Sequence, residues 1–169
     1  MIEKSVILPN NLTSFHVVAH SMGCIIAVAL AAKLSGSVKS VALVAPAPPY
    51  RERIMKIVTW GRKLPTAITE LTKHTHQSVW HSMHNVICGG AKFTDKHIGM
   101  LIIPHVKLQI PELTIHGDKD DVVPIDCLWN MKAKFLAVEV EVIARTDHSS
   151  VIMSRKEFFI TKLVCLWAA

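Results

Sequence analysis

The sequence lacks several features that would place it in other classes of protein. No apolar run reaches the roughly 18–20 residues that a membrane-spanning helix needs. The longest, residues 24–32, stops at Lys33. The first eleven residues hold no apolar core and no small-residue cleavage site, so no secretory signal is expected. A chain of 169 residues that is 50% hydrophobic is instead predicted to form a globular domain with a substantial core.

Informative cysteine and charge patterns are also absent. The net charge of +6 comes from scattered Lys and Arg, with a mild concentration in residues 51–63 and no interleaved aromatics. This distribution argues against a nucleic-acid-binding surface and is compatible with weak association with anionic membranes or acidic wall polymers. The four cysteines form no C-x-x-C pair and no metal-ligand spacing, so they do not indicate a compartment. They are Cys24, Cys88, Cys127 and Cys165.

The most informative stretch joins a predicted strand to a predicted helix. Residues 15–19 are apolar and β-branched, which is typical of a strand buried on both faces, and residues 24–32 are apolar all round, which predicts a buried helix. Between them lies Ala-His-Ser-Met-Gly, with Ser21 at the centre. This is the nucleophile-elbow pattern G-x-S-x-G with alanine in place of the first glycine.

The elbow pattern predicts a specific local geometry. Ser21 must take a strained turn, so small residues, Ala19 and Gly23, are needed where strand and helix approach. The turn would raise the Ser21 hydroxyl above the sheet and direct the Met22 N–H at a developing oxyanion. His20 completes the elbow. The alternative for this motif alone is a serine that merely caps the helix.

The remaining pattern predicts alternating strands and helices. The first eight residues read as the end of a helix that stops at Pro9. The last predicted strand, residues 138–143, alternates with Glu139 and Glu141 outward, so it should lie near a sheet edge. The crossover from the first strand to the second predicts parallel pairing. The other predicted strands are residues 40–45 and 112–116, and the later helices are residues 125–135 and 155–167.

The middle of the chain differs from this pattern. Its helix-like periodicity is weaker, and it carries Trp60, Trp80 and many histidines. We therefore predict a unit of residues 1–46, a helical cap over the active site at 47–105, and a C-terminal part at 106–169. A metal site is an alternative role for the cap histidines, but no carboxylate or cysteine completes it, so neither a metal nor a cofactor is expected. These histidines are His74, His76, His81 and His84.

Three residues follow the order of a hydrolase catalytic triad. Ser21 comes first, Asp120 follows the next-to-last strand in Gly117-x-x-Asp120, and His148 follows the last strand. This is the α/β-hydrolase order, in which histidine takes the serine proton and the aspartate orients the ring. Asp118 and Asp121 remain alternatives for the acid. The arrangement predicts serine ester hydrolysis through an acyl-enzyme.

Three blocks of this sequence carry a resemblance to a known family. They are HVVAHSMGC at 16–24, the block from His74 to Gly89 with its Trp, His and Cys spacing, and His116-Gly117-x-x-Asp120 with Pro124. The chain resembles, from about residue 2 to 167, the plant α/β-hydrolases of the Bodyguard type, which are probable lysophospholipases.

The resemblance implies an extracellular enzyme of cuticle formation that acts on lipid or polyester acyl esters. It implies Ser21 as nucleophile, Asp120 as acid and His148 as base. The fold normally has about four strands before the elbow strand, whereas some fourteen residues precede it here, so a truncated form without the N-terminal strands is expected. Residues 15–19 would then form an open edge. The rival hypothesis is an impaired remnant that acts by associating with another chain through that edge.

Overall fold

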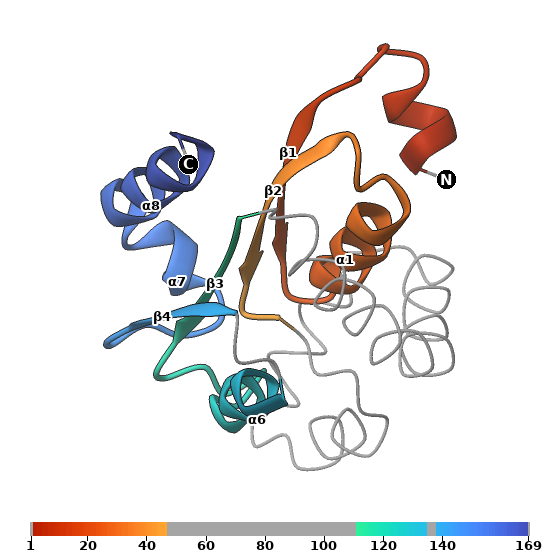
Figure 1. The fold of residues 1–169 in the computed structure, drawn as a ribbon. Helices are drawn as coiled ribbons and strands as arrows, with labels where there is room; N and C mark the ends of the chain where they lie inside the picture. Colours follow the sequence, from red (N-terminus) through yellow and green to blue (C-terminus); the bar gives the residue numbers. More distant parts are fainter. Residues whose placement is uncertain (1, 47–110, 135–137, 169) are drawn as a thin grey trace, which may run out of the picture.

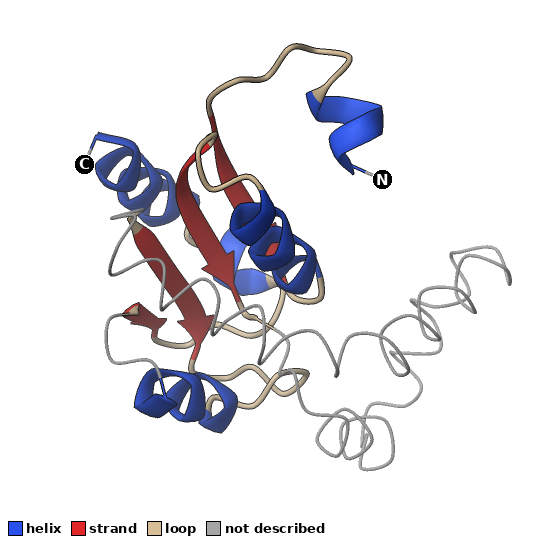
Figure 2. Cartoon of the chain, turned by 45° about the vertical axis from the view of Figure 1, so that its right-hand side comes forward, coloured by secondary structure: helices blue, strands red, loops and turns tan. Residues whose placement is uncertain are grey.

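The core of the fold is a parallel sheet. The computed structural model describes residues 2–46, 111–134 and 138–168. Within these ranges four parallel strands lie in the order β1-β2-β3-β4, with helices on both faces (Figure 1; Figure 2). The prediction of a parallel α/β sheet is confirmed. The elements are η1 (Glu3–Ile7), β1 (Phe15–His20), α1 (Gly23–Lys33), β2 (Val38–Val44), β3 (Glu112–Gly117), α6 (Asp126–Lys134), β4 (Glu139–Ile143), α7 (Ser150–Met153) and α8 (Lys156–Ala168).

The predicted cap lies outside the described residues. The same holds for the boundaries proposed for it and for the four histidines of the metal alternative, which therefore stay predictions. None of the helices in the described ranges is both long and apolar enough to cross a membrane.

Helix α1 covers one face of β1 and β2. Its small and branched side chains pack against alternate residues of both strands, because successive strand residues point to opposite faces. Ala31 is fully buried at the centre of this contact. The buried members of the cluster are Cys24, Ala27, Val28, Ala31, Val38, Val41 and Leu43.

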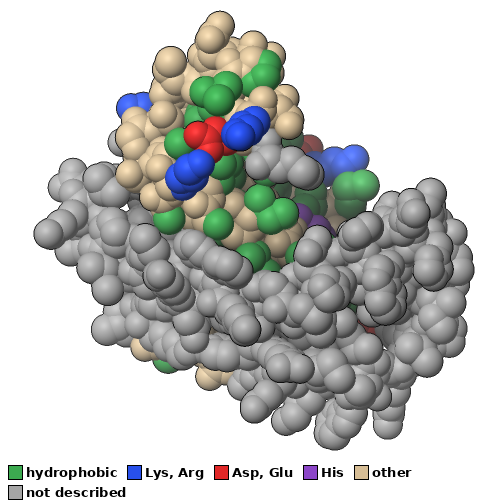
Figure 3. Space-filling view, turned by 90° about the vertical axis from the view of Figure 1, so that its right-hand side faces the viewer, with side chains coloured by type: hydrophobic (Ala, Val, Ile, Leu, Met, Phe, Trp, Pro, Cys, Tyr) green, Lys and Arg blue, Asp and Glu red, His purple; other side chains and the backbone are tan. Residues whose placement is uncertain are grey.

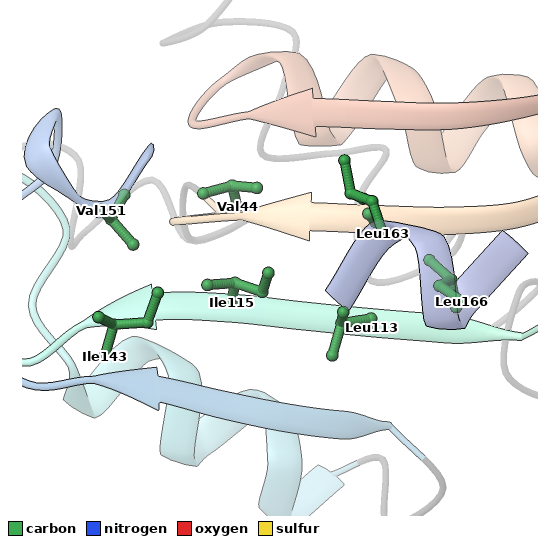
Figure 4. Packing of buried hydrophobic residues seen from close by; sticks show 8 residues of the cluster. Val44, Leu113, Ile115, Ile143, Val151, Leu163 and Leu166 are labelled. Carbon is green, nitrogen blue, oxygen red and sulfur yellow. The ribbon is translucent and has the colours of Figure 1, made fainter. Parts of the chain in front are cut away.

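Helices α7 and α8 cover the opposite face. Figure 4 shows Leu163 and Leu166 of α8 and Val151 of α7 over the side chains of the three later strands. Val44, Ile115 and Val151 have no exposed surface, so this second cluster forms a core on the other face of the sheet from the first. Its buried members are Ala42, Val44, Leu113, Ile115, Ile143, Val151, Leu163 and Leu166.

Two burial predictions were wrong in detail. Strand β1 is not buried on both faces: it lies at the sheet edge, and Val18 is 44% exposed. Helix α1 is not buried all round, since Ile26 is 51% exposed on the side away from the sheet. Both elements carry apolar residues on two sides, but in each only one side packs against another described part of the chain.

Two ion pairs lie near the two edges of the sheet. Strand β4 forms the other edge, as its alternation predicted, and Glu141 pairs with Lys162 of α8. At the β1 end, Lys33 of α1 pairs with Glu3 of η1. Figure 3 shows the face with η1 and α1, where charged side chains lie beside scattered apolar ones.

Candidate active site

The carboxyl ends of all four parallel strands lie at one edge of the sheet. The residues that follow β1, β3 and β4 therefore come together there, as is usual for ligand sites in open α/β sheets. The three predicted catalytic residues come from these segments: Ser21 follows β1, Asp120 follows β3 and His148 follows β4.

Ser21 has a backbone conformation that few non-glycine residues adopt. Its φ is 53°, in the left-handed region, at the joint between β1 and α1. The Ser21 N–H donates to the Val44 carbonyl at the end of β2 (2.8 Å), which attaches the turn to the sheet. In the described part of the chain, the Ser21 hydroxyl makes no hydrogen bond to His148.

The residues around Ser21 are small and closely packed. A Cβ added to Gly23 would lie 3.9 Å from the Ala19 Cβ, an ordinary van der Waals contact. The Cys24 thiol donates to the Ala19 carbonyl (3.3 Å), and burial raises the pKa of Cys24 to about 12. The Met22 N–H, at the N-cap of α1, has no acceptor among the described residues. An N–H at the start of a helix has no acceptor within the helix and is the kind of group that can donate to an anion.

Asp120 is held in a buried turn after β3. Its Oδ1 accepts the N–H groups of Val122 (3.0 Å) and Val123 (2.7 Å), and its side chain is fully buried. A Cβ added to Gly117 would lie 2.4 Å from the Thr146 carbonyl oxygen. Gly117 has no positive φ. The glycine is thus needed for the close approach of the end of β3 to the loop after β4, and not for an unusual backbone conformation.

His148 is hydrogen-bonded to Asp120. The distance from His148 Nδ1 to Asp120 Oδ2 is 2.8 Å. Because an ionised carboxylate can only accept, Nδ1 carries the proton and Nε2 is left as an acceptor. This is the tautomer that a general base needs in order to take a serine proton.

His20 links the elbow to the same loop. Its Nε2–H donates to the His148 carbonyl oxygen (2.8 Å), and the two ring centroids are 4.7 Å apart. Burial lowers the pKa of His20. The structure therefore brings His148 beside the residue that precedes Ser21, although β1 and β4 are the two edges of the sheet.

The alternative acids lie in a different environment. Asp118 is exposed, and its Oδ1 accepts the Thr146 N–H at 3.3 Å. Asp121 is also exposed. The carboxylate of the buried Asp120 is hydrogen-bonded to His148.

Sequence reasoning missed the role of His116. It is fully buried on β3, and its Nε2–H donates to the Val123 carbonyl (2.9 Å), which closes the turn around Asp120. Its Nε2 is 3.7 Å from Asp120 Oδ2, and burial lowers its pKa. The signal was a histidine at the end of a buried strand, directly before Gly117. Among the described residues, no group of three or more His, Cys, Asp or Glu side chains is arranged to hold a metal ion.

Comparisons with known proteins fit this geometry. A family model described as "alpha/beta hydrolase fold" matches residues 1–71. The crystal structure of a carboxylesterase from the archaeon Nitrososphaera gargenis superposes with a TM-score of 0.63 at 18% identity, over 96% of this chain and 68% of that one. The chain has the α/β-hydrolase fold.

Closer relatives come from Arabidopsis thaliana. The chain is 59% identical to "Probable lysophospholipase BODYGUARD 5" over 99% of its own length and 48% of that protein. It is 41% identical to "Probable lysophospholipase BODYGUARD 4" over 99% of its length and 51% of that protein. The predicted resemblance to Bodyguard-type α/β-hydrolases is confirmed, and the chain spans about half the length of these curated relatives.

Proposed function

We propose that this chain carries the nucleophile, acid and base of a serine hydrolase that cleaves carboxylic esters. The observation that carries the proposal is the 2.8 Å hydrogen bond between Asp120 and His148, whose ring contacts His20, the residue before a serine with φ 53° on a strand-to-helix turn. A buried carboxylate that fixes a histidine tautomer beside a strained serine is the arrangement that acyl transfer needs.

In the proposed reaction, Ser21 Oγ attacks the ester carbonyl carbon while His148 Nε2 takes the hydroxyl proton. The Met22 N–H stabilises the negative oxygen of the tetrahedral intermediate. His148 then gives the proton to the leaving alcohol, and an acyl-enzyme remains. Water, deprotonated by the same nitrogen, releases the acid and restores Ser21. Throughout, Asp120 stabilises the imidazolium of His148.

The substrate class comes from the relatives. Proteins named probable lysophospholipases support an ester of a lipid acyl group, and the Bodyguard resemblance extends this to polyester acyl groups of the plant cuticle. Action outside the cell, at a membrane surface or in the cell wall, belongs to the same proposal.

Labelling by a fluorophosphonate probe tests this function. The probe phosphonylates an activated serine with loss of fluoride, and it needs no knowledge of the ester. We expect labelling of the purified chain that disappears in Ser21→Ala. Ser14→Ala, in the loop before β1, is the matched control and should label as the wild type does. Equal labelling of Ser21→Ala and wild type would refute the assignment.

A second candidate function is association with another chain. It is favoured by the position of β1, which is paired on one side only among the described strands. An unpaired strand edge presents N–H and C=O groups to a partner strand. Size-exclusion chromatography separates the two candidates, because a monomer with Ser21-dependent labelling excludes a purely associative role.

A further inference from the structure

His20 occupies a position that the proposed triad does not explain. It is the last residue of β1 and directly precedes Ser21. Its ring lies against His148, with centroids 4.7 Å apart and planes tilted by 41°, and its Nε2 is 2.8 Å from the His148 carbonyl oxygen. One side chain thus contacts both the ring and the backbone of the proposed base.

The contact joins segments that the sheet keeps apart. Strands β1 and β4 are the two edges, with β2 and β3 between them, so the loop with His148 must cross the carboxyl ends of two strands to reach Ser21. Asp120 holds His148 from the β3 side through Nδ1. His20 holds it from the β1 side. The two contacts act on different atoms of His148 and together define where its ring lies.

The chemistry of the contact suits a support that stays uncharged. A carbonyl oxygen can only accept, so Nε2 of His20 carries the proton. Burial lowers the pKa of His20, which keeps the ring neutral near pH 7. A neutral ring adds no repulsion when His148 becomes an imidazolium during the reaction, whereas a Lys or Arg at this position would.

We propose that His20 is a positioning residue that fixes the His148 loop beside Ser21 through its hydrogen bond to the His148 carbonyl. This inference rests on the function proposed above. A base must come within about 2.6–3.2 Å of the hydroxyl it deprotonates. Misplacement by about 1 Å can reduce a rate by about 100-fold.

Three variants separate the hydrogen bond from simple packing. His20→Phe keeps a ring and loses the donor, so we expect fluorophosphonate labelling to be about 10–100-fold slower. His20→Gln places an amide N–H near the original Nε2 and should recover most of the wild-type rate. His16→Phe is the matched control, because His16 lies on the same strand but its ring contacts Trp167 and Ser40 and not the His148 loop. It should label as the wild type does.

A structural readout makes the test independent of activity. Hydrogen exchange of a peptide spanning residues 144–153 should be faster in His20→Phe than in wild type and His20→Gln, while exchange in α8 stays unchanged and shows that the variant is folded. If this pattern appears and the wild type does not label, the positioning role stands and the proposed function fails. The inference would be overturned if His20→Phe exchanged and labelled at the wild-type rates. It would also be overturned if His20→Gln labelled as slowly as His20→Phe.

Discussion

The two ends of the candidate site are built in different ways. The elbow end is local: Ser21, Met22 and Gly23 are consecutive, and they lie between an exposed edge strand and one helix. The acid–base end is assembled from separate segments. The buried Asp120 is held by its own turn and by His148, which lies in the loop after β4.

The difference follows from what each group must do. A nucleophile needs one strained turn, and small neighbours with a single backbone bond from Ser21 to Val44 are enough to hold it. A carboxylate that orients a histidine must be buried without losing its hydrogen bonds, and that requires several partners. The acid–base end should therefore be the more sensitive of the two to substitution.

The largest expected effect is at Asp120. In Asp120→Asn the amide N–H₂ would face Nδ1 of His148 and favour the tautomer with Nε2 protonated, which cannot accept the serine proton. We expect fluorophosphonate labelling about 10³–10⁴-fold slower. Asp118→Asn is the control and should label normally, because Asp118 is exposed. The opposite ranking would assign the acid to Asp118.

The contact between the two buried loops gives the next largest effect. In Gly117→Ala the new Cβ would lie 2.4 Å from the Thr146 carbonyl, so the loops must separate. We expect the free energy of unfolding to fall by about 2–3 kcal/mol in urea titrations. Gly36→Ala has nothing within 4 Å and should leave the stability nearly unchanged. Equal losses of stability in the two variants would show that Gly117 and the Thr146 carbonyl are not in tight contact.

At the elbow end, the two sides of α1 should differ. Val28 is buried against the sheet and Ile26 is 51% exposed. Val28→Ala should lower the free energy of unfolding by about 2 kcal/mol, since it leaves a cavity. Ile26→Ala should change it by less than about 0.5 kcal/mol. Thermal or urea unfolding measures both. A large loss in Ile26→Ala would mean that something covers this side of the helix.

The smallest expected effect depends on pH and concerns the start of β3. Burial raises the pKa of Glu112 from 4.5 to about 7. The folded state therefore keeps a proton that the unfolded state loses between pH 4.5 and 7, so stability falls as pH rises through that window. Glu112→Gln removes this loss.

We expect Glu112→Gln to be more stable than the wild type by about 1 kcal/mol at pH 8, a reduced value because the residue is only partly buried. The difference should vanish near pH 4.5. Urea titrations at the two pH values measure it. A constant difference at both would indicate a cause other than ionisation.

The sequence predicted the parallel sheet because its apolar β-branched runs and glycine stops are local signals. It also predicted helix α1 and the edge position of β4 from the alternation at Glu139 and Glu141. It did not predict α7, which begins at Ser150 between the strand predicted at 138–143 and the helix predicted at 155–167. There Asp147 Oδ1 accepts the N–H groups of Ser149 and Ser150, a capping pattern that spans only a few residues.

By itself, then, the sequence determined the elbow, since the spacing of Ala19, Ser21 and Gly23 acts within five residues. The sequence pattern Gly117-x-x-Asp120 favoured Asp120 but left Asp118 and Asp121 open as alternatives. Only the tertiary structure shows the contact itself: the turn closed by His116 buries Asp120, and its carboxylate is hydrogen-bonded to the His148 ring. The His20 contact was decided in the same way. Hydrogen bonds across 28 and 128 residues depend on how the strands are ordered in the sheet, and no local pattern encodes that order.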